Sequence, residues 1–233
     1  ASDLAAVLQV GDAEAQRDEA EAAQVPGPAK YRKLGDFHEV VNGSLVMPAP
    51  LWFIAGNHEP FDALDAHGPG EWGPGVTYLG RAGLAEIGGL RVGFLSGIYG
   101  EKVFRLSKTG ELERRWGKHS AHYTSQELQT AWEAMVDGVD VLIAHDWPVG
   151  VNDLDVNDQS RFGPPGDENV RALIDDFQPI ISLHGHMHRP ATAVFGDTTV
   201  NCLAIVGRHS GDPMSAVGLW DISPHPRTAA RLV

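Results

Sequence analysis

Side chains that bind metal ions recur along this chain, and each group of them stands directly after a short apolar run. In order, the groups are Gly11-Asp12, Gly56-Asn57-His58-Glu59, His145-Asp146 and Gly185-His186-Met187-His188. Binding sites in open α/β sheets form in the crevice outside the carboxyl ends of the strands. A carboxylate, an amide and three histidines gathered there suit divalent transition metals such as Mn, Fe or Zn. The order therefore predicts an α/β fold that supports metal-assisted phosphoester hydrolysis.

The apolar runs are expected to be buried strands, because they lack alternation and are rich in Val, Leu and Ile. They are Leu4–Val10, Leu51–Ala55, Leu90–Leu95, Val139–Ala144 and Ile180–Leu183. Helical periodicity predicts three helices between them. These are Glu14–Ala23, Ser125–Met135, for which Ser125 is the expected N-cap, and Glu168–Phe177.

The C-terminal part contains two more strand-like runs, Thr198–Val206 and Ala216–Ile222. We expect these two strands to pair antiparallel with each other. Three segments have the composition of loops: Val25–Tyr31, Asp65–Gly75 and Val149–Asp167. The last two each follow a ligand group, so we expect them to border the site. The whole pattern predicts an α/β sandwich of mixed sheets flanked by helices, in one domain over residues 1–233.

The net charge of the chain limits the kinds of molecule that it can bind. The chain has 233 residues and a net charge of −13, from 31 acidic and 18 basic residues, and two bound divalent ions would offset only four of those charges. Phosphate contacts supply most non-specific affinity for nucleic acids, and an acidic surface repels polyanions. We therefore expect no extended duplex-binding face, whereas a nucleotide or a short RNA end can still enter a metal-centred pocket.

Nothing in the sequence predicts a membrane span or an export signal. No run approaches the roughly 18 to 20 apolar residues that a spanning helix needs, and no charged-then-apolar leader opens the chain. The single cysteine, Cys202, excludes an internal disulfide and favours a reducing, cytoplasmic location. Because Cys202 lies in a strand-like run, we expect a buried, inert thiol.

Asp12 ends the first apolar run behind a glycine that permits a sharp turn. Taken alone, Gly-Asp is most often only a turn signal, and its weight here comes from the groups that follow. A carboxylate can bridge two cations about 3.5–4 Å apart, the spacing of two-metal hydrolytic sites. We therefore interpret Asp12 as a metal ligand.

Asn57 and His58 allow two interpretations. Asn57 could be the N-cap of a helix with Glu59 in its first turn. Alternatively, the Asn57 side-chain oxygen binds a metal without adding charge, and His58 stays off the metal and donates a proton to the leaving oxygen as a general acid. The other ligand groups favour the second interpretation.

Three histidines near two strand ends complete the candidate ligands. His145 follows an apolar run, and the adjacent Asp146 could orient an imidazole through its second nitrogen. Residues i and i+2 of an extended segment point to the same side, so His186 and His188 can face one cavity. His184 shares their parity but lies deeper in the run, and we expect it to be packed or to support a ligand.

A second segment, Gly35-Asp36-Phe37-His38, imitates an Asp-x-His metal motif. The basic stretch before it is no buried strand, so we assign Asp36 and His38 to the solvated surface. Among the remaining histidines, His119 and His122 could contact substrate.

The ordered groups resemble the calcineurin-like metallophosphoesterase superfamily and, more narrowly, the catalytic domain of RNA lariat debranching enzymes. The resemblance covers most of residues 4–190. Its matching stretches are Gly11-Asp12-Ala13-Glu14-Ala15-Gln16-Arg17-Asp18-Glu19-Ala20, Val25-Pro26, Lys30-Tyr31-Arg32, Trp72, Tyr78-Leu79-Gly80, Ala82-Gly83, Arg91-Val92-Gly93, Ser96-Gly97-Ile98-Tyr99 and His145-Asp146-Trp147-Pro148.

The resemblance implies a role for each matching residue. Asp12 would bridge two divalent ions. Asn57, His145 and His186 would complete one metal site, and His188 would serve the other. His58 would be the catalytic histidine beside the scissile phosphate, and an activated water or hydroxide would attack phosphorus in line with the leaving oxygen.

The chain also departs from that pattern. The family opens with a strand ending in Asp-x-His or Cys-x-His and a following helix, and this chain lacks both, so we expect it to be N-terminally incomplete. The site served by His188 would then have only Asp12 as a second ligand. The segment Gly100–Thr124, with six of the 18 basic residues, occupies the place of the family's substrate-recognition loop, although an ordinary solvated loop would look the same.

The sequence thus leaves three hypotheses. The leading one is a metal-dependent phosphodiesterase with a dinuclear centre and a debranching-like site. A second is a small-substrate phosphatase or nucleotide phosphodiesterase of the same fold. A third is a catalytically incomplete scaffold, because a fold does not guarantee a function, although a scaffold has no need of His58.

Overall fold

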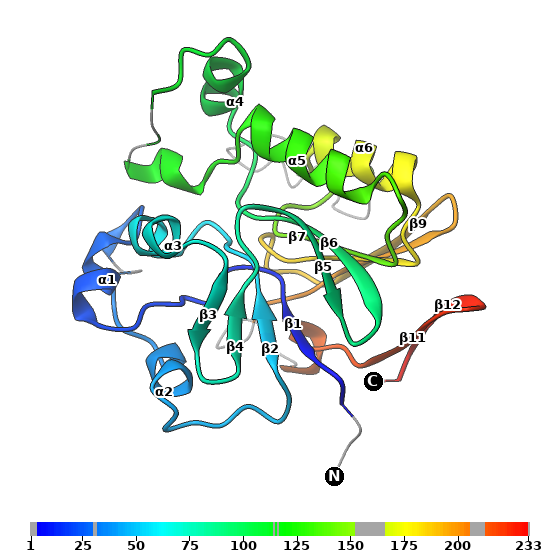
Figure 1. Ribbon diagram of the computed structural model, residues 1–233, viewed down its shortest axis with the longest axis horizontal. Coiled ribbons are helices and arrows are strands. Elements are labelled where there is room, and N and C mark those ends of the chain that lie inside the picture. The colour runs from blue at the N-terminus through cyan, green and yellow to red at the C-terminus, as the bar shows by residue number, and fades with distance from the viewer. Residues whose placement is uncertain are drawn as a thin grey trace.

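The computed structural model describes residues 4–29, 32–113, 115, 117–151, 166–205 and 213–232. Two β-sheets pack face to face in this part of the chain, and helices cover the outer face of each sheet (Figure 1). This arrangement confirms the predicted α/β sandwich of mixed sheets. None of the helices described is both long and apolar enough to cross a membrane.

The first sheet has four strands in the order β1-β2-β4-β3. Strands β1 (Val7–Gln9), β2 (Leu51–Phe53) and β4 (Val76–Tyr78) are parallel, and β3 (Gly70–Gly73) pairs antiparallel with β4 at the edge. The carboxyl ends of β1 and β2, which precede Asp12 and Asn57, therefore lie side by side.

The second sheet has six strands in the order β5-β6-β7-β8-β10-β9. They are β5 (Ala82–Ile87), β6 (Leu90–Leu95), β7 (Val141–Ala144), β8 (Ile181–His184), β9 (Ala191–Phe195) and β10 (Thr198–Cys202). The central strands β6, β7, β8 and β10 are parallel, and the two edge strands are antiparallel to their neighbours. The ends of β7 and β8, which carry the histidines, are again neighbours.

Alternation along the strands explains the layers. In β2, Leu51 and Phe53 face a cluster shared with α2 (Phe37–Val41) and α3 (Phe61–His67), whereas Trp52 faces the cluster between the two sheets. Successive side chains of a strand point to opposite faces, so each sheet buries both of its faces. Complete burial of a Leu, Ile or Phe side chain stabilises the folded state by about 1.5–3 kcal/mol relative to leaving it exposed.

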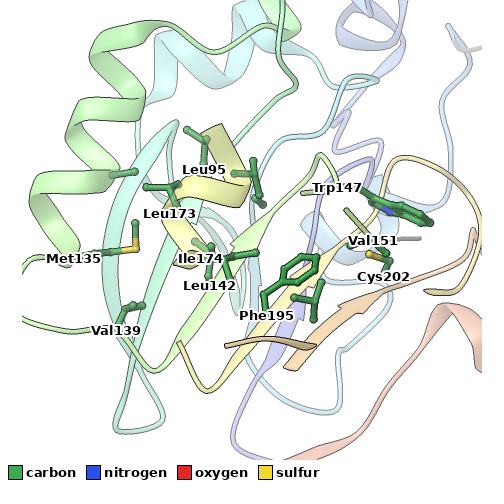
Figure 2. Close-up of a cluster of buried hydrophobic side chains, with 14 of the residues drawn as sticks. Leu95, Met135, Val139, Leu142, Trp147, Val151, Leu173, Ile174, Phe195 and Cys202 are labelled. Atoms are coloured by element: carbon green, nitrogen blue, oxygen red, sulfur yellow. The ribbon is translucent and has the colours of Figure 1, made fainter. Parts of the chain in front are cut away.

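Helices α5 (Ser125–Met135) and α6 (Glu168–Phe177) cover the outer face of the second sheet. Figure 2 shows the cluster beneath them, in which Met135 of α5 and Leu173 of α6 share one apolar core with Leu142 of β7. The strand ends that carry His145 and His186 thus belong to a sheet that is packed on both sides.

The remaining elements lie around these layers. They are α1 (Glu19–Gln24), α4 (Glu101–Lys108), two short 3₁₀ helices (Gly117–Ala121 and Pro213–Ala216) and a hairpin of β11 (Trp220–Pro224) and β12 (Arg227–Arg231). Trp220 and Ile222 of the hairpin pack against the cluster between the sheets.

Several predicted elements are confirmed. Each of the five apolar runs coincides with a strand over three or more residues, α5 and α6 have the predicted bounds, and Cys202 is buried. The fold class is confirmed as well, with helices on the outside of both sheets.

Other predictions were wrong. The first helix begins at Glu19 instead of Glu14, because Asp18 caps it by accepting hydrogen bonds from Ala20 N and Glu21 N. The N-cap of α5 is Thr124, not Ser125, and Thr124 forms a capping box with Glu127. A capping box satisfies two helix-end N–H groups at once, which explains why the helix starts there.

The predicted strand pair also differs from the structure. Strand β10 pairs with β8 and β9, and β11 pairs with β12, so Thr198–Val206 and Ala216–Ile222 are not partners. The expected loop Asp65–Gly75 contains the end of α3 and all of β3. The loops Val25–Tyr31 and Val149–Asp167 extend outside the described residues.

A buried polar contact ties the segment before α5 to the start of α6. The Tyr123 hydroxyl donates to Asp167 Oδ2, and Asn169 Nδ2 donates to the Tyr123 oxygen at 2.9 Å. Asp167 Oδ1 also accepts from Asn169 N at 2.8 Å and so caps α6. Burial, together with the charge of Asp146, raises the pKa of Asp167 to about 6.

The raised pKa predicts a pH-dependent stability that Asp167→Asn removes. Between about pH 4 and pH 6 the folded state keeps a proton on Asp167 that the unfolded state has lost, so stability falls as pH rises through this window. The loss is roughly 2–3 kcal/mol. Urea unfolding of the metal-free protein from pH 4 to 6.5 measures the free energy of unfolding of both proteins. Over this range the wild type should lose that amount of stability relative to Asp167→Asn.

Asp176→Asn changes an exposed carboxylate of the same helix and is the matched control. Its stability curve should run parallel to that of the wild type. Parallel curves for Asp167→Asn as well would contradict the assignment.

Candidate metal centre

The predicted ligands meet where the carboxyl ends of the two sheets come together. Gly97 N, beyond β6, donates to the Ala55 carbonyl beyond β2 at 2.7 Å, and Gly185 N donates to the His145 carbonyl at 3.1 Å. The first bond joins the turn that carries Asn57 to the second sheet, and the second joins the turn of His145 to that of His186. The Asp12 carboxylate contacts the first and second of these three turns.

Asp12 is held in an unusual backbone conformation by its own side chain. Its φ is 58°, in the left-handed region that costs a non-glycine residue free energy. Its Oδ1 accepts hydrogen bonds from Asn57 N at 2.7 Å and His58 N at 2.9 Å. One carboxylate oxygen therefore joins the turn after β1 to the turn after β2, and Oδ2 stays directed toward His145.

His145 is oriented by a backbone carbonyl of the other sheet. Its Nδ1 lies 2.9 Å from the Val10 oxygen. Because a carbonyl oxygen only accepts, Nδ1 carries a proton, so Nε2 is the ring nitrogen left to bind a metal ion. Nε2 lies 3.2 Å from Asn57 Oδ1 and 3.4 Å from Asp12 Oδ2.

The Asn57 side chain is the centre of the group. Its Oδ1 is 2.8 Å from His186 Nδ1 and 3.2 Å from His145 Nε2. The helix interpretation of Asn57 was wrong, because α3 begins only at Phe61 with Pro60 at its N-cap. The amide faces the histidines instead.

These separations fit a metal ion. Ligand bonds of about 2.0–2.2 Å place neighbouring donor atoms about 3.0–3.5 Å apart, close to the 2.8–3.4 Å found between these donors. In the part of the chain that the structure describes, no three His, Cys, Asp and Glu side chains are grouped so as to hold a metal by themselves. The Asn57 amide is what joins Asp12, His145 and His186 into one donor set.

The charges at the site favour a cation. Burial alone would raise the pKa of Asp12, but the nearby His145 and His58 hold it well below its usual range. Burial would lower the pKa of His145, yet the Asp12 carboxylate raises it. Burial and His145 lower the pKa of His186 to about 3. A positive charge is therefore stabilised between Asp12 and His145, whereas His186 stays neutral, as a metal ligand must.

The other two predicted residues lie beside this donor set. His58 is half-buried, its backbone N–H bonds Asp12, and Gln16 Nε2 donates to its carbonyl at 3.4 Å. His188 is exposed and has a φ of 59°. It is near enough that its charge lowers the pKa of His186.

Glu59 has a supporting role that the sequence interpretation missed. Its fully buried carboxylate accepts from Ala13 N at 2.7 Å and Ala15 N at 2.8 Å, which secures the turn that carries Asp12. Burial raises the pKa of Glu59 to about 8, against the two N–H bonds. The signal was its place directly after Asn57-His58, the one ligand group that ends in a glutamate.

The sequence interpretation had allowed the Asp146 carboxylate to orient an imidazole, but its described hydrogen bonds go to backbone N–H groups, and it is the Asp146 backbone oxygen that faces His184 Nδ1. The carboxylate accepts from Tyr99 N at 3.3 Å and Trp147 N at 3.0 Å, so it braces backbone instead. The motif-like Asp36 is exposed, as expected. His119 and His122 place their Nδ1 atoms 3.3 Å apart, close to Lys102 and Lys118, whose charges help to lower the pKa of His119.

Comparison with known proteins agrees with this geometry. The model of the calcineurin-like phosphoesterase family matches residues 6–190. A lariat debranching enzyme of Arabidopsis thaliana is 30% identical over 202 residues, which are 78% of this chain and 47% of that protein. A lariat debranching enzyme of Schizosaccharomyces pombe is 28% identical over 203 residues, 79% of this chain and 42% of that protein. The chain thus spans less than half the length of these relatives.

Glycine at position 56 leaves the space that the site needs, so Gly56→Ala should disrupt it. A Cβ there would lie 2.2 Å from Asp12 Oδ1 and 2.7 Å from His145 Cε1, so two candidate ligands must move. We expect a loss of at least about tenfold in Mn²⁺ affinity, measured by calorimetric titration.

Gly35→Ala is the control, because a Cβ there meets only Glu14 Oε2, at an ordinary 3.4 Å. Its Mn²⁺ affinity should equal that of the wild type. Equal affinity for Gly56→Ala would place the metal elsewhere.

Proposed function

Because the chain belongs to the calcineurin-like phosphoesterase family, we propose that it is a metal-dependent phosphodiesterase with a debranching-like site. The observation that carries the proposal is the convergence of Asp12, Asn57, His145 and His186, whose donor atoms lie 2.8–3.4 Å from their neighbours. The relatives named lariat debranching enzymes support the narrower assignment.

The residues divide the work as follows. Asn57, His145, His186 and Asp12 would hold a divalent ion such as Mn, Fe or Zn. Such an ion supplies Lewis-acid polarisation of the phosphoryl group and activates the attacking water. His58, on the turn that Asp12 Oδ1 secures, donates a proton to the leaving oxygen. Proton transfer of this kind contributes typically 10²–10⁴-fold in rate.

Substrate class follows from charge. A net charge of −13 disfavours long polyanions, whereas Lys102 and Lys118 beside His119 provide local positive charge. A nucleotide or a short RNA therefore suits the site better than a duplex. A small-substrate phosphatase is the second candidate, because the same ligands serve both reactions.

The proposed acid predicts a defect that depends on the leaving group. With Mn²⁺ loaded, His58→Ala should lose about 10²–10⁴-fold in turnover of a 2′,5′-linked dinucleotide, whose alkoxide leaving group needs a proton. Hydrolysis of bis(p-nitrophenyl) phosphate should suffer much less, since nitrophenolate leaves without one. Rates on 2′,5′-linked, 3′,5′-linked and monoester substrates separate the debranching-like enzyme from the phosphatase.

His67→Ala, which alters an exposed histidine of α3, is the control and should keep both activities. An equal loss on both substrates by His58→Ala would sink the general-acid role. No turnover of any phosphoester by the metal-loaded wild type would support the scaffold hypothesis instead.

Metal content tests the number of sites. The second site would have only Asp12 and His188, and His188 is exposed, so we expect one tightly held Mn²⁺ per chain by elemental analysis after dialysis. Asn57→Ala should abolish it, whereas His188→Ala should leave it unchanged. Two tightly held ions per chain would mean that residues not assigned here complete a second site.

A further inference from the structure

His184 is buried at the end of β8 and contacts the backbone on both sides of His145. Its Nδ1 lies 2.8 Å from the Asp146 oxygen and 3.2 Å from the Ala144 oxygen. Its Nε2 lies 2.7 Å from Ser182 Oγ. The His184 ring is fully buried. The ring nitrogens that face Asn57 belong to His145 and His186 instead.

The partners define one tautomer. Both oxygens facing Nδ1 are carbonyls, which only accept, so Nδ1 carries the proton. Nε2 then has a free lone pair, and the Ser182 hydroxyl donates to it. The imidazole is neutral, and all its polar atoms are satisfied.

The ring fills the place where two strands separate. The β7–β8 ladder ends at the pair Ile143 and Leu183. Beyond it, β7 continues beside β6 through Ala144, and β8 continues beside β10 through His184. Backbone groups there lack a ladder partner, and an unpaired buried polar group costs free energy.

His184 and the next residue together satisfy three consecutive carbonyls. His184 Nδ1 donates to Ala144 and Asp146, and Gly185 N donates to the His145 oxygen at 3.1 Å. The backbone that carries His145 is therefore fixed from β8, while its ring is fixed by Val10. A leucine could fill the same volume but could make none of these bonds.

We propose that His184, held in one tautomer by the Ala144 and Asp146 carbonyls and bonded by Ser182 at its other nitrogen, is a positioning residue that sets the direction of His145 Nε2 and thereby the affinity of the metal centre. This inference rests on the proposed function, since it requires that His145 bind the metal. Hydrogen-bond partners behind a metal ligand typically change metal affinity by 10–100-fold.

Three variants test the donor separately from the volume. His184→Leu keeps the bulk and removes both bonds, and should weaken Co²⁺ binding about 10–100-fold and change the visible Co²⁺ spectrum. His184→Asn keeps an N–H near the Nδ1 position and should recover most of the affinity and the spectrum. Ser182→Ala removes only the hydrogen bond to Nε2, which anchors the far side of the ring, and should give an intermediate loss. Nitrogen-15 shifts of His145 in the metal-free protein should follow the same order.

Leu173→Ala is the stability control, because Leu173 is fully buried in the core under α6. It should lower the urea midpoint without changing the Co²⁺ affinity or spectrum. If folded His184→Leu or, should that variant not fold, Ser182→Ala binds Co²⁺ like the wild type, the positioning role is wrong and the proposed function stands. A wild type that binds no Co²⁺ or Mn²⁺ overturns both.

Discussion

The hydrogen bond from His145 Nδ1 to the Val10 carbonyl is the contact on which the site depends. It joins residues 135 positions apart in the sequence, and it is made between the ends of two different sheets. Because Nδ1 donates to this carbonyl, Nε2 is the ring nitrogen that faces Asp12 and Asn57. Small residues make the close approach possible, since a Cβ at Gly11 would lie 2.3 Å from the His145 ring nitrogen. The sandwich and its site are therefore specified together.

Backbone strain is concentrated in the turns that carry the ligands. Among the described residues, five non-glycine residues have a left-handed φ, and four of them are Asp12, Glu14, His186 and His188. Such conformations persist only where the surroundings over-determine them. Here the compensation is visible: Glu59 accepts two N–H groups of the first turn, and Asp12 accepts two of the next. The side chains that hold these turns, Glu59 and Asp12, are therefore as necessary to the site as the candidate ligands.

The sequence predicted the strands, and which candidate ligands would come together, better than it predicted the contacts that hold them in place. Buried parallel strands and polar residues at their ends are local patterns, so β1, β2, β7 and β8 and the group around Asn57 could be found without the structure. The partners of those side chains could not. Val10 offers His145 a backbone oxygen, which every residue possesses, so no residue type marks it. The late start of α1 could not be predicted either. Glu14 adopts a left-handed φ of 50°, which is not helical and which its residue type does not indicate.

Electrostatics reconcile an acidic protein with the anionic substrate that we propose for it. Of the four proposed ligands, only Asp12 is charged when the metal is bound, because an amide and two neutral imidazoles add none. A divalent ion would then leave the centre with a net positive charge, in partly buried turns where its field is less screened than in open water. The acidic remainder of the surface acts at longer range and opposes long polyanions. Under the proposed function, one phosphodiester at the centre would be attracted and each additional phosphate outside it repelled, so this charge distribution would favour short substrates or chain ends.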